Sequence, residues 1–378
     1  MGGAGASMSG HSRLSPSSAH RWVHCPGSVQ MCEQFPDSSG SAALEGEAAH
    51  WIGSEVLSGR GGDAFAGRTA PNGVILTEEM EDAAKVYVGA VHKVLNGRPA
   101  GSHCAVEKSI TIPLVHPEFH GTPDCAIDDE IELHIFDLKY GYGIVDPFDN
   151  WQLLCYAIGL LKPSHQFISL HIVQPRPFHY DGPHRTWRVG VGMLASYLKQ
   201  LQESAREALT ATPRCVSGSH CKYCSARHAC SAARKAAMFA IDYTSHMRAE
   251  PLPPEALSME LRTLERAEEA IQFVKAGLMA QATNCIKAGT TIPGWELRAG
   301  TGRKVWKVPV AEVIALSQVM GINLQKQIDT ITPTQARKAG LPEELVNAYS
   351  ENSAGEVKLT QCNMTKIANV FGAQPQGE

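Results

Sequence analysis

The chain has 378 residues, of which 43% are hydrophobic and 19% are charged, and its formal net charge is -4. This length suits one large domain with a smaller one, and the mild acidity excludes a globally basic nucleic-acid binder, so any DNA contact must use local patches. No run is long enough to span a membrane, and residues 1–9 lack the apolar core of a signal peptide. We therefore expect a reducing cytoplasm, where the 11 cysteines hold metal or lie buried instead of forming disulfides.

The N-terminal part is predicted to begin with a disordered segment and to continue as helices. Residues 1–13 are predicted to form a disordered tail. A short helix then leads to Cys25, a loop rich in serine and glycine follows it, and helices are predicted over 42–57 and 77–95. The second helix has an apolar stripe formed by Met80, Ala84, Tyr87, Val88 and Val91.

In the middle of the chain, the spacing of apolar residues changes from a helical to an alternating, strand-like pattern. Short alternating apolar runs over 104–112, 121–128 and 131–139 predict three strands, the last two joined by a turn at Asp128-Asp129-Glu130. Later segments alternate between the two kinds of element: helix 150–161, strands 167–174 and 186–191, helix 193–211, and a helical stretch near 232–240. This order predicts an α/β fold with a mixed central sheet flanked by helices.

Pro251-Leu-Pro-Pro254 interrupts the pattern and is the predicted domain boundary, so the core covers 14–250 and a mainly helical accessory region covers 251–378. A long helix over 254–288 and a hairpin over 292–308 are expected there. The hairpin gathers Arg298, Arg303 and Lys304 beside Trp306. Cations next to aromatic rings suit a nucleic-acid strand, although an ordinary charged hairpin would have the same composition.

An acidic site is predicted where the 121–128 and 131–139 strands meet. Gly121-Thr-Pro-Asp124 begins one strand, and Asp137-Leu-Lys139 ends the other. Asp137 and Lys139 are two residues apart and so share one face of the strand. Two carboxylates and an ammonium then converge, and carboxylate oxygens are hard ligands suited to Mg²⁺ or Mn²⁺.

Two helices offer further groups for this site. His50 in the 42–57 helix could add a nitrogen ligand, whereas Gln152 and Tyr156 have the spacing that puts them on one helix face, where they could position a DNA strand. Glu107 and Glu47 are possible accessory carboxylates, although surface charge is the better explanation of both. Singly, each of these residues is better explained as an ordinary packed or solvated side chain.

Together, the motifs resemble the RecB-like branch of the PD-(D/E)xK nuclease superfamily. That branch has a helix histidine, a Gly-x-x-Asp strand, an Asp/Glu-x-Lys strand and a Gln-x-x-x-Tyr helix in this order. The resemblance implies a restriction-endonuclease-like core and a metal held by His50, Asp124, Asp137 and the Leu138 carbonyl. It also implies that Lys139 is the catalytic lysine.

A second metal site is predicted from Cys221-x2-Cys224-x5-Cys230, because thiolates at this spacing enclose a soft metal centre. The fourth ligand could be Cys25, Cys32 or Cys215. The iron–sulfur members of the RecB-like branch, namely AddB-type and CRISPR adaptation nucleases, place one cysteine before the core and three after it. That resemblance implies a 4Fe–4S cluster on Cys25, Cys221, Cys224 and Cys230; structural zinc is the alternative.

The sequence thus predicts a metal-dependent deoxyribonuclease, more an exonuclease than an endonuclease. The overall layout resembles an uncharacterised phage and prophage family, which implies a role in phage recombination or DNA processing in a bacterial cytoplasm, beside a single-strand annealing protein. The rival is a DNA-binding or assembly factor with a silent nuclease fold, and a third possibility is a zinc-stabilised protein that handles no nucleic acid. The sequence leaves the oligomeric state open.

Overall fold

The computed structural model describes residues 13–35, 40–62, 64–99, 102–244 and 252–297. All of them belong to one compact unit, Met1–Leu297, and a second unit covers Arg298–Glu378. The tail over 1–12, most of the predicted hairpin, and its residues Arg298, Arg303, Lys304 and Trp306 lie outside the described residues. No described helix is both long and apolar enough to cross a membrane.

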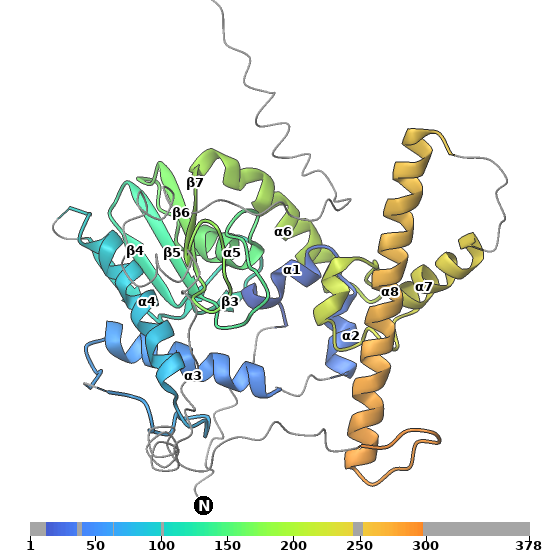
Figure 1. Ribbon diagram of the computed structural model, residues 1–378. Coiled ribbons are helices and arrows are strands. Elements are labelled where there is room, and N and C mark those ends of the chain that lie inside the picture. Colours follow the sequence, from blue (N-terminus) through green and yellow to red (C-terminus); the bar gives the residue numbers. More distant parts are fainter. Residues whose placement is uncertain (1–12, 36–39, 63, 100–101, 245–251, 298–378) are drawn as a thin grey trace, which may run out of the picture. The chain divides into compact units, whose positions relative to one another are not determined.

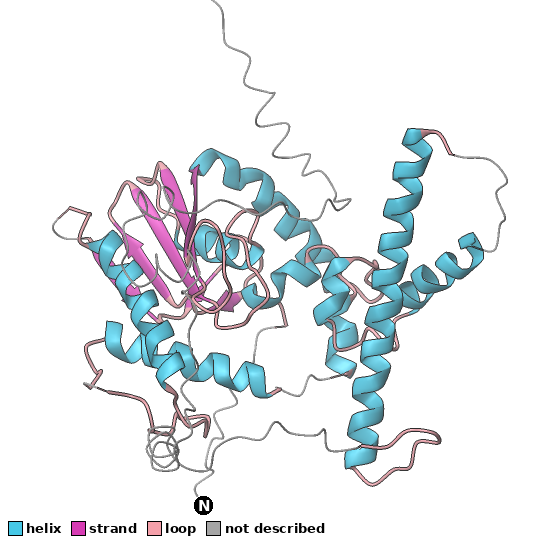
Figure 2. Cartoon of the chain, in the orientation of Figure 1, coloured by secondary structure: helices cyan, strands magenta, loops and turns pink. Residues whose placement is uncertain are grey.

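A five-stranded sheet lies at the centre, in the order β1-β4-β5-β6-β7 (Figures 1 and 2). Its strands are β1 (His103–Val106), β4 (Cys125–Asp128), β5 (Glu132–Leu138), β6 (Phe167–Val173) and β7 (His184–Gly190). Only β5 and β6 pair in parallel, and the other pairs are antiparallel. The predicted α/β fold with a mixed central sheet is therefore confirmed.

Two of the predicted strands are divided, which corrects the sequence-based boundaries. The 104–112 run forms β1 and a separate β2 (Ile110–Thr111), and the 121–128 run is split between β3 (His120–Gly121) and β4. Glu107, with φ of 48°, turns the chain between β1 and β2. Pro123 has no amide proton to give to a ladder, so β4 begins only after it. β2 and β3 pair with each other apart from the main sheet.

Helices cover both faces of the sheet (Figure 1). On one face, Tyr87 and Val91 of α4 (Glu78–Leu95) pack with Phe136 and Leu138 of β5. On the other face, α5 (Trp151–Leu160) and α6 (Leu194–Ala208) share a core with inward residues of β5 and β6. α3 (Ser41–Leu57) packs on α4. The four helices match the predicted segments to within a few residues.

The N-terminal segment and the chain after α6 lie side by side (Figure 1). The N-terminal segment forms η1 (Pro16–Ser18), α1 (Ala19–Trp22) and α2 (Ser28–Gln34), where a loop was predicted in place of α2. Sequence patterning missed α2 because it has only seven residues and carries no capping side chain. η2 (Val191–Met193) precedes α6, and η3 (Ser219–Tyr223) follows it, contacting both α1 and α8 (Pro254–Lys287). α8 also packs along α7 (Ser231–Thr244).

Candidate active site and cysteine cluster

Asp124 and Asp137 lie at the end of the sheet where β4 begins and β5 ends. The β4–β5 register pairs Cys125 with Phe136, so the next residues outward, Asp124 and Asp137, are opposite each other and point to the same face. The Leu138 amide donates to Asp124 Oδ2 at 2.7 Å. Amide and carbonyl of a strand residue point to the same side, so the Leu138 carbonyl also lies on the side of Asp124.

His50 of α3 and Glu107 join Asp124 to form a compact group of possible metal ligands. His50 Nδ1 lies 3.1 Å from Asp124 Oδ2, and one ligand atom from each of the three residues falls within 4.8 Å of the others. Glu107 was expected to be a surface charge. Its placement arises from the turn between β1 and β2, a feature that strand periodicity does not reveal. Glu47 is exposed and accepts a bond from Asn72 instead.

The charges in this group depend on one another. Burial favours neutral His50, but the charge of Asp124 outweighs it and raises the pKa of His50 to about 9. Burial likewise favours neutral Asp124, but His50 and the Leu138 amide hold its pKa below the usual range. Burial and then the charge of Asp124 raise the pKa of Glu107 to about 7. A divalent cation would relieve this crowding, since it favours ionised carboxylates and competes with the proton on His50.

Lys139 connects the acidic group to α5. Its Nζ lies 2.7 Å from Asp137 Oδ2 and donates to Gln152 Oε1 at 3.0 Å. Burial lowers the pKa of Lys139, but Asp137 outweighs burial and keeps it above its usual value. Fixed between these two side chains, the ammonium can orient a water or a phosphate oxygen.

Tyr156 follows Gln152 by one turn of α5 and bonds to it, and burial raises the pKa of its phenol. Gly121 explains how Tyr156 comes so close to the N-terminal segment. A methyl group on Gly121 would lie 2.6 Å from Pro16 Cγ and 2.9 Å from Tyr156 Cε1. The motif glycine is thus required by close packing, and it anchors η1 against α5.

Tyr87 is a further residue of the site that sequence reasoning assigned only to an apolar stripe. It is buried on α4, and its hydroxyl has no partner among the described residues. Burial, followed by the charges of Asp124 and other acids of the site, raises its pKa well above the usual value. A hydrated cation held by the carboxylates would bring a water that could hydrogen-bond to this unpaired hydroxyl. The residues present therefore fit a divalent metal.

The cysteines expected to bind the second metal come together from opposite ends of the core. Cys25, Cys221, Cys224 and Cys230 are all buried, and they line one small cavity together with Cys215, Arg21 and Arg227. The Val216 amide donates to Cys25 Sγ at 3.3 Å. Cys32 Sγ lies 3.7 Å from Cys224 Sγ. Both alternative fourth ligands are thus close, so six thiols surround this place.

The buried thiols and the arginines beside them suit a soft metal centre with thiolate ligands. A tetrahedral zinc site and an iron–sulfur cluster both use such ligands, so this arrangement fits either kind of metal.

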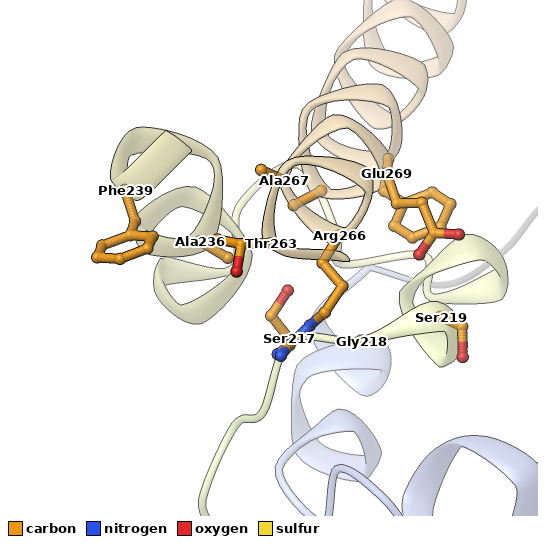
Figure 3. Close-up of a pocket in the computed structure, with 11 residues that line it drawn as sticks. Ser217, Gly218, Ser219, Ala236, Phe239, Thr263, Arg266, Ala267 and Glu269 are labelled. Carbon is orange, nitrogen blue, oxygen red and sulfur yellow. The ribbon is translucent and has the colours of Figure 1, made fainter. Parts of the chain in front are cut away.

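A separate hollow of ≈ 500 Å³ lies behind the cysteine loop, between η3, α7 and α8 (Figure 3). Ser217, Gly218 and Ser219 form one wall, and Thr263 and Arg266 of α8 face them. Arg266 extends toward Ser217 (Figure 3). The hollow lacks clustered acids or thiols, so we assign the chemistry to the two sites above.

Residues 11–360 match the sequence family described as "Protein of unknown function (DUF2800)". The chain belongs to the DUF2800 family. Among solved structures, this DUF2800 protein is similar to SSO0001, with 16% identity over 60% of this chain and 89% of that chain, at a TM-score of 0.30. It is also similar to the alkaline exonuclease LHK-Exo from Laribacter hongkongensis, with 13% identity over 50% of this chain and 90% of that chain, at a TM-score of 0.24. LHK-Exo in complex with dAMP matches to the same extent.

Proposed function

We propose that this DUF2800 protein is a metal-dependent nuclease that hydrolyses phosphodiester bonds in DNA, as an exonuclease. The observation that carries the proposal is the convergence of His50, Glu107 and Asp124 on one side of Asp137 and Lys139. His50, Asp124, Asp137 and the Leu138 carbonyl would hold Mg²⁺ or Mn²⁺, and Glu107 is placed to assist. The metal would supply charge for the phosphate and acidify a water.

The protein's own groups have separable roles. The Lys139 ammonium, fixed between Asp137 and Gln152, would orient the attacking water and donate to the phosphate. Gln152 and Tyr156 would position the strand from α5. The low-dielectric floor formed by β5, where Asp137 is 1% exposed, strengthens each of these interactions.

We further propose that the cysteines hold a 4Fe–4S cluster on Cys25, Cys221, Cys224 and Cys230, with structural zinc as the alternative. Support comes from the cavity that these cysteines share and from the bond of the Val216 amide to Cys25. Nuclease chemistry needs no electron, so the cluster would act as a structural clamp. We also propose that the protein acts in phage DNA recombination in a bacterial cytoplasm, together with a single-strand annealing protein.

One experiment separates this function from a DNA-binding protein with a silent nuclease fold. Protein purified without oxygen is incubated with end-labelled single- and double-stranded DNA, with Mn²⁺ or with EDTA. We expect degradation with Mn²⁺ only, and a loss of about 10²-fold or more in Lys139→Ala. Lys199→Ala, on the exposed surface of α6, is the control. A protein that binds DNA but leaves it intact under all conditions is the result expected of the silent fold.

A further inference from the structure

The cysteine loop carries an exposed aromatic residue that its packing does not require. Tyr223 lies between Cys221 and Cys224, both buried, yet 57% of its own surface is exposed. Its backbone is nonetheless fixed: its carbonyl accepts from Arg21 Nη1 at 3.0 Å, and the Cys224 amide bonds to the Cys221 carbonyl at 3.1 Å. A large ring held rigidly in solvent is typical of a binding contact, because ordering it on binding costs little entropy.

The Tyr223 hydroxyl lies beside the loop that leaves Lys139. A methyl group on Gly143, four residues beyond Lys139, would lie 4.0 Å from that hydroxyl. On its other side, Tyr223 meets the His20 ring of α1 edge-on, with 6.0 Å between the ring centres. Tyr223 therefore lies between α1 and the loop that continues from the proposed catalytic lysine.

The chemistry of this surface suits one strand of DNA. Lys222 Nζ lies 5.1 Å from the centre of the Tyr223 ring, which joins a cation to a stacking face. Tyr142, in the loop that leaves Lys139, is 64% exposed. A lysine and two exposed aromatic rings beside the proposed nuclease site match single-stranded nucleic acid, whose bases stack and whose phosphates pair with lysine.

We propose that Lys222 and Tyr223 of the cysteine loop bind the single DNA strand that enters the nuclease site. This inference rests on the proposed function. It makes Tyr223 a positioning residue: its ring would stack on a base while Lys222 pairs with a neighbouring phosphate. The cysteine cluster would then hold a strand-binding finger over the active site, as well as closing the core.

The test measures binding of a fluorescein-labelled twenty-nucleotide single strand, and of the same strand in a duplex, by anisotropy, with Ca²⁺ in place of Mn²⁺ and over a range of salt. Tyr223→Ala should raise Kd about tenfold or more, because stacking on one base has about that effect. Tyr223→Phe keeps the stacking face and should bind like the wild type. Lys222→Ala should flatten the plot of log Kd against log salt by about 0.7.

Tyr180→Ala and Lys199→Ala are matched controls, since both residues are exposed. Visible absorbance and the thermal midpoint show whether each variant keeps its cysteine site. Equal Kd in Tyr223→Ala and the wild type would overturn the inference, as would a loss confined to duplex DNA. Failure of the proposed function is distinct: the wild type would not degrade DNA with Mn²⁺, yet the anisotropy assay would still report on Tyr223.

Discussion

The roles of several single residues in this protein depend on their neighbours in the fold and could not be inferred from residue type alone. Gly121 is an example, because it is defined by what surrounds it: Pro16 of η1 and Tyr156 of α5 leave no space for a side chain. Asp124 is another, since one of its oxygens serves both His50 and the Leu138 amide. Close packing and shared acceptors of this kind make the site sensitive to changes of one carbon atom.

We predict that Gly121→Ala destabilises the protein by about 1–3 kcal/mol, because the added methyl group overpacks the contact with Pro16 and Tyr156. The same shift should displace Tyr156 and lower DNA degradation. Chemical denaturation and the nuclease assay measure the two effects.

Gly89→Ala is the matched control for this change. Gly89 is an exposed position of α4, where an added carbon meets nothing within 4 Å. Helix propensity should make this variant more stable by about 0.5–1 kcal/mol. If both alanines had the same effect, the packing account of Gly121 would be wrong.

At the scale of elements, β5, β6 and β7 carry a row of three histidines on the face toward α4, of which His134 and His171 are buried and His184 is half-buried. His134 Nδ1 and His171 Nε2 are 3.0 Å apart, as are His171 Nδ1 and His184 Nε2. Burial, followed by nearby positive charges, lowers the pKa of His134 to about 4 and that of His171 well below its usual value. The groups facing this row include Glu132, Arg98, Arg188, Lys93 and Thr186.

This row predicts a loss of stability in mild acid. In the unfolded chain these histidines take up protons near pH 6.5, whereas in the folded protein the pKa of His134 is about 4. Their contribution to stability is therefore complete above pH 6.5 and declines as the pH falls toward 4. His134→Gln should reduce that decline, with each unit of pKa depression worth about 1.4 kcal/mol. Denaturant titrations at pH 7.5 and 5 measure the effect, and exposed His103→Gln serves as the control. An unchanged pH dependence in His134→Gln would contradict the prediction.

The elements also show how far the sequence could be interpreted. Strongly periodic segments such as α4 and β5 were predicted to within a residue or two, and the order of helices and strands gave the mixed sheet. The strand breaks at Glu107 and Pro123 were missed because both depend on a turn between short strands that pair with different partners. The sequence favoured surface charge for Glu107 over a place in the site, because the turn that positions it was not predicted. Tyr87 was missed as a site residue because it belongs to an apolar stripe that packing alone would explain.

At the scale of the molecule, two segments far apart in the chain close the core together. The Gly27 amide donates to the Arg214 carbonyl at 2.9 Å, and a side chain on Gly27 would collide with Cys215 Sγ at 2.5 Å. Cys25 and Val216, which are 191 residues apart, share the bond described above. The contact therefore constrains most of the core at once.

We predict that Cys221→Ala or Cys230→Ala loses visible absorbance and unfolds roughly 5 °C or more below the wild type, since 2 kcal/mol already corresponds to about 4–8 °C in a domain of this size. The thiols are buried, so a metal held by them would contribute directly to folding. Cys285→Ala, half-buried on α8, is the control and should match the wild type in both measurements. Full stability in the Cys221 variant would refute the clamp.

The hydrogen bond between the Val216 amide and Cys25 can form only late in synthesis of the chain. The ribosome releases Cys25 first, and the 191 residues that separate it from Val216 take about 10–40 s to translate. Through that interval the N-terminal thiol lacks its partners from the far end of the core. If these cysteines hold the proposed cluster, loading would come after the sheet has been made, and the supply of iron and sulfide would be the step that completes the protein.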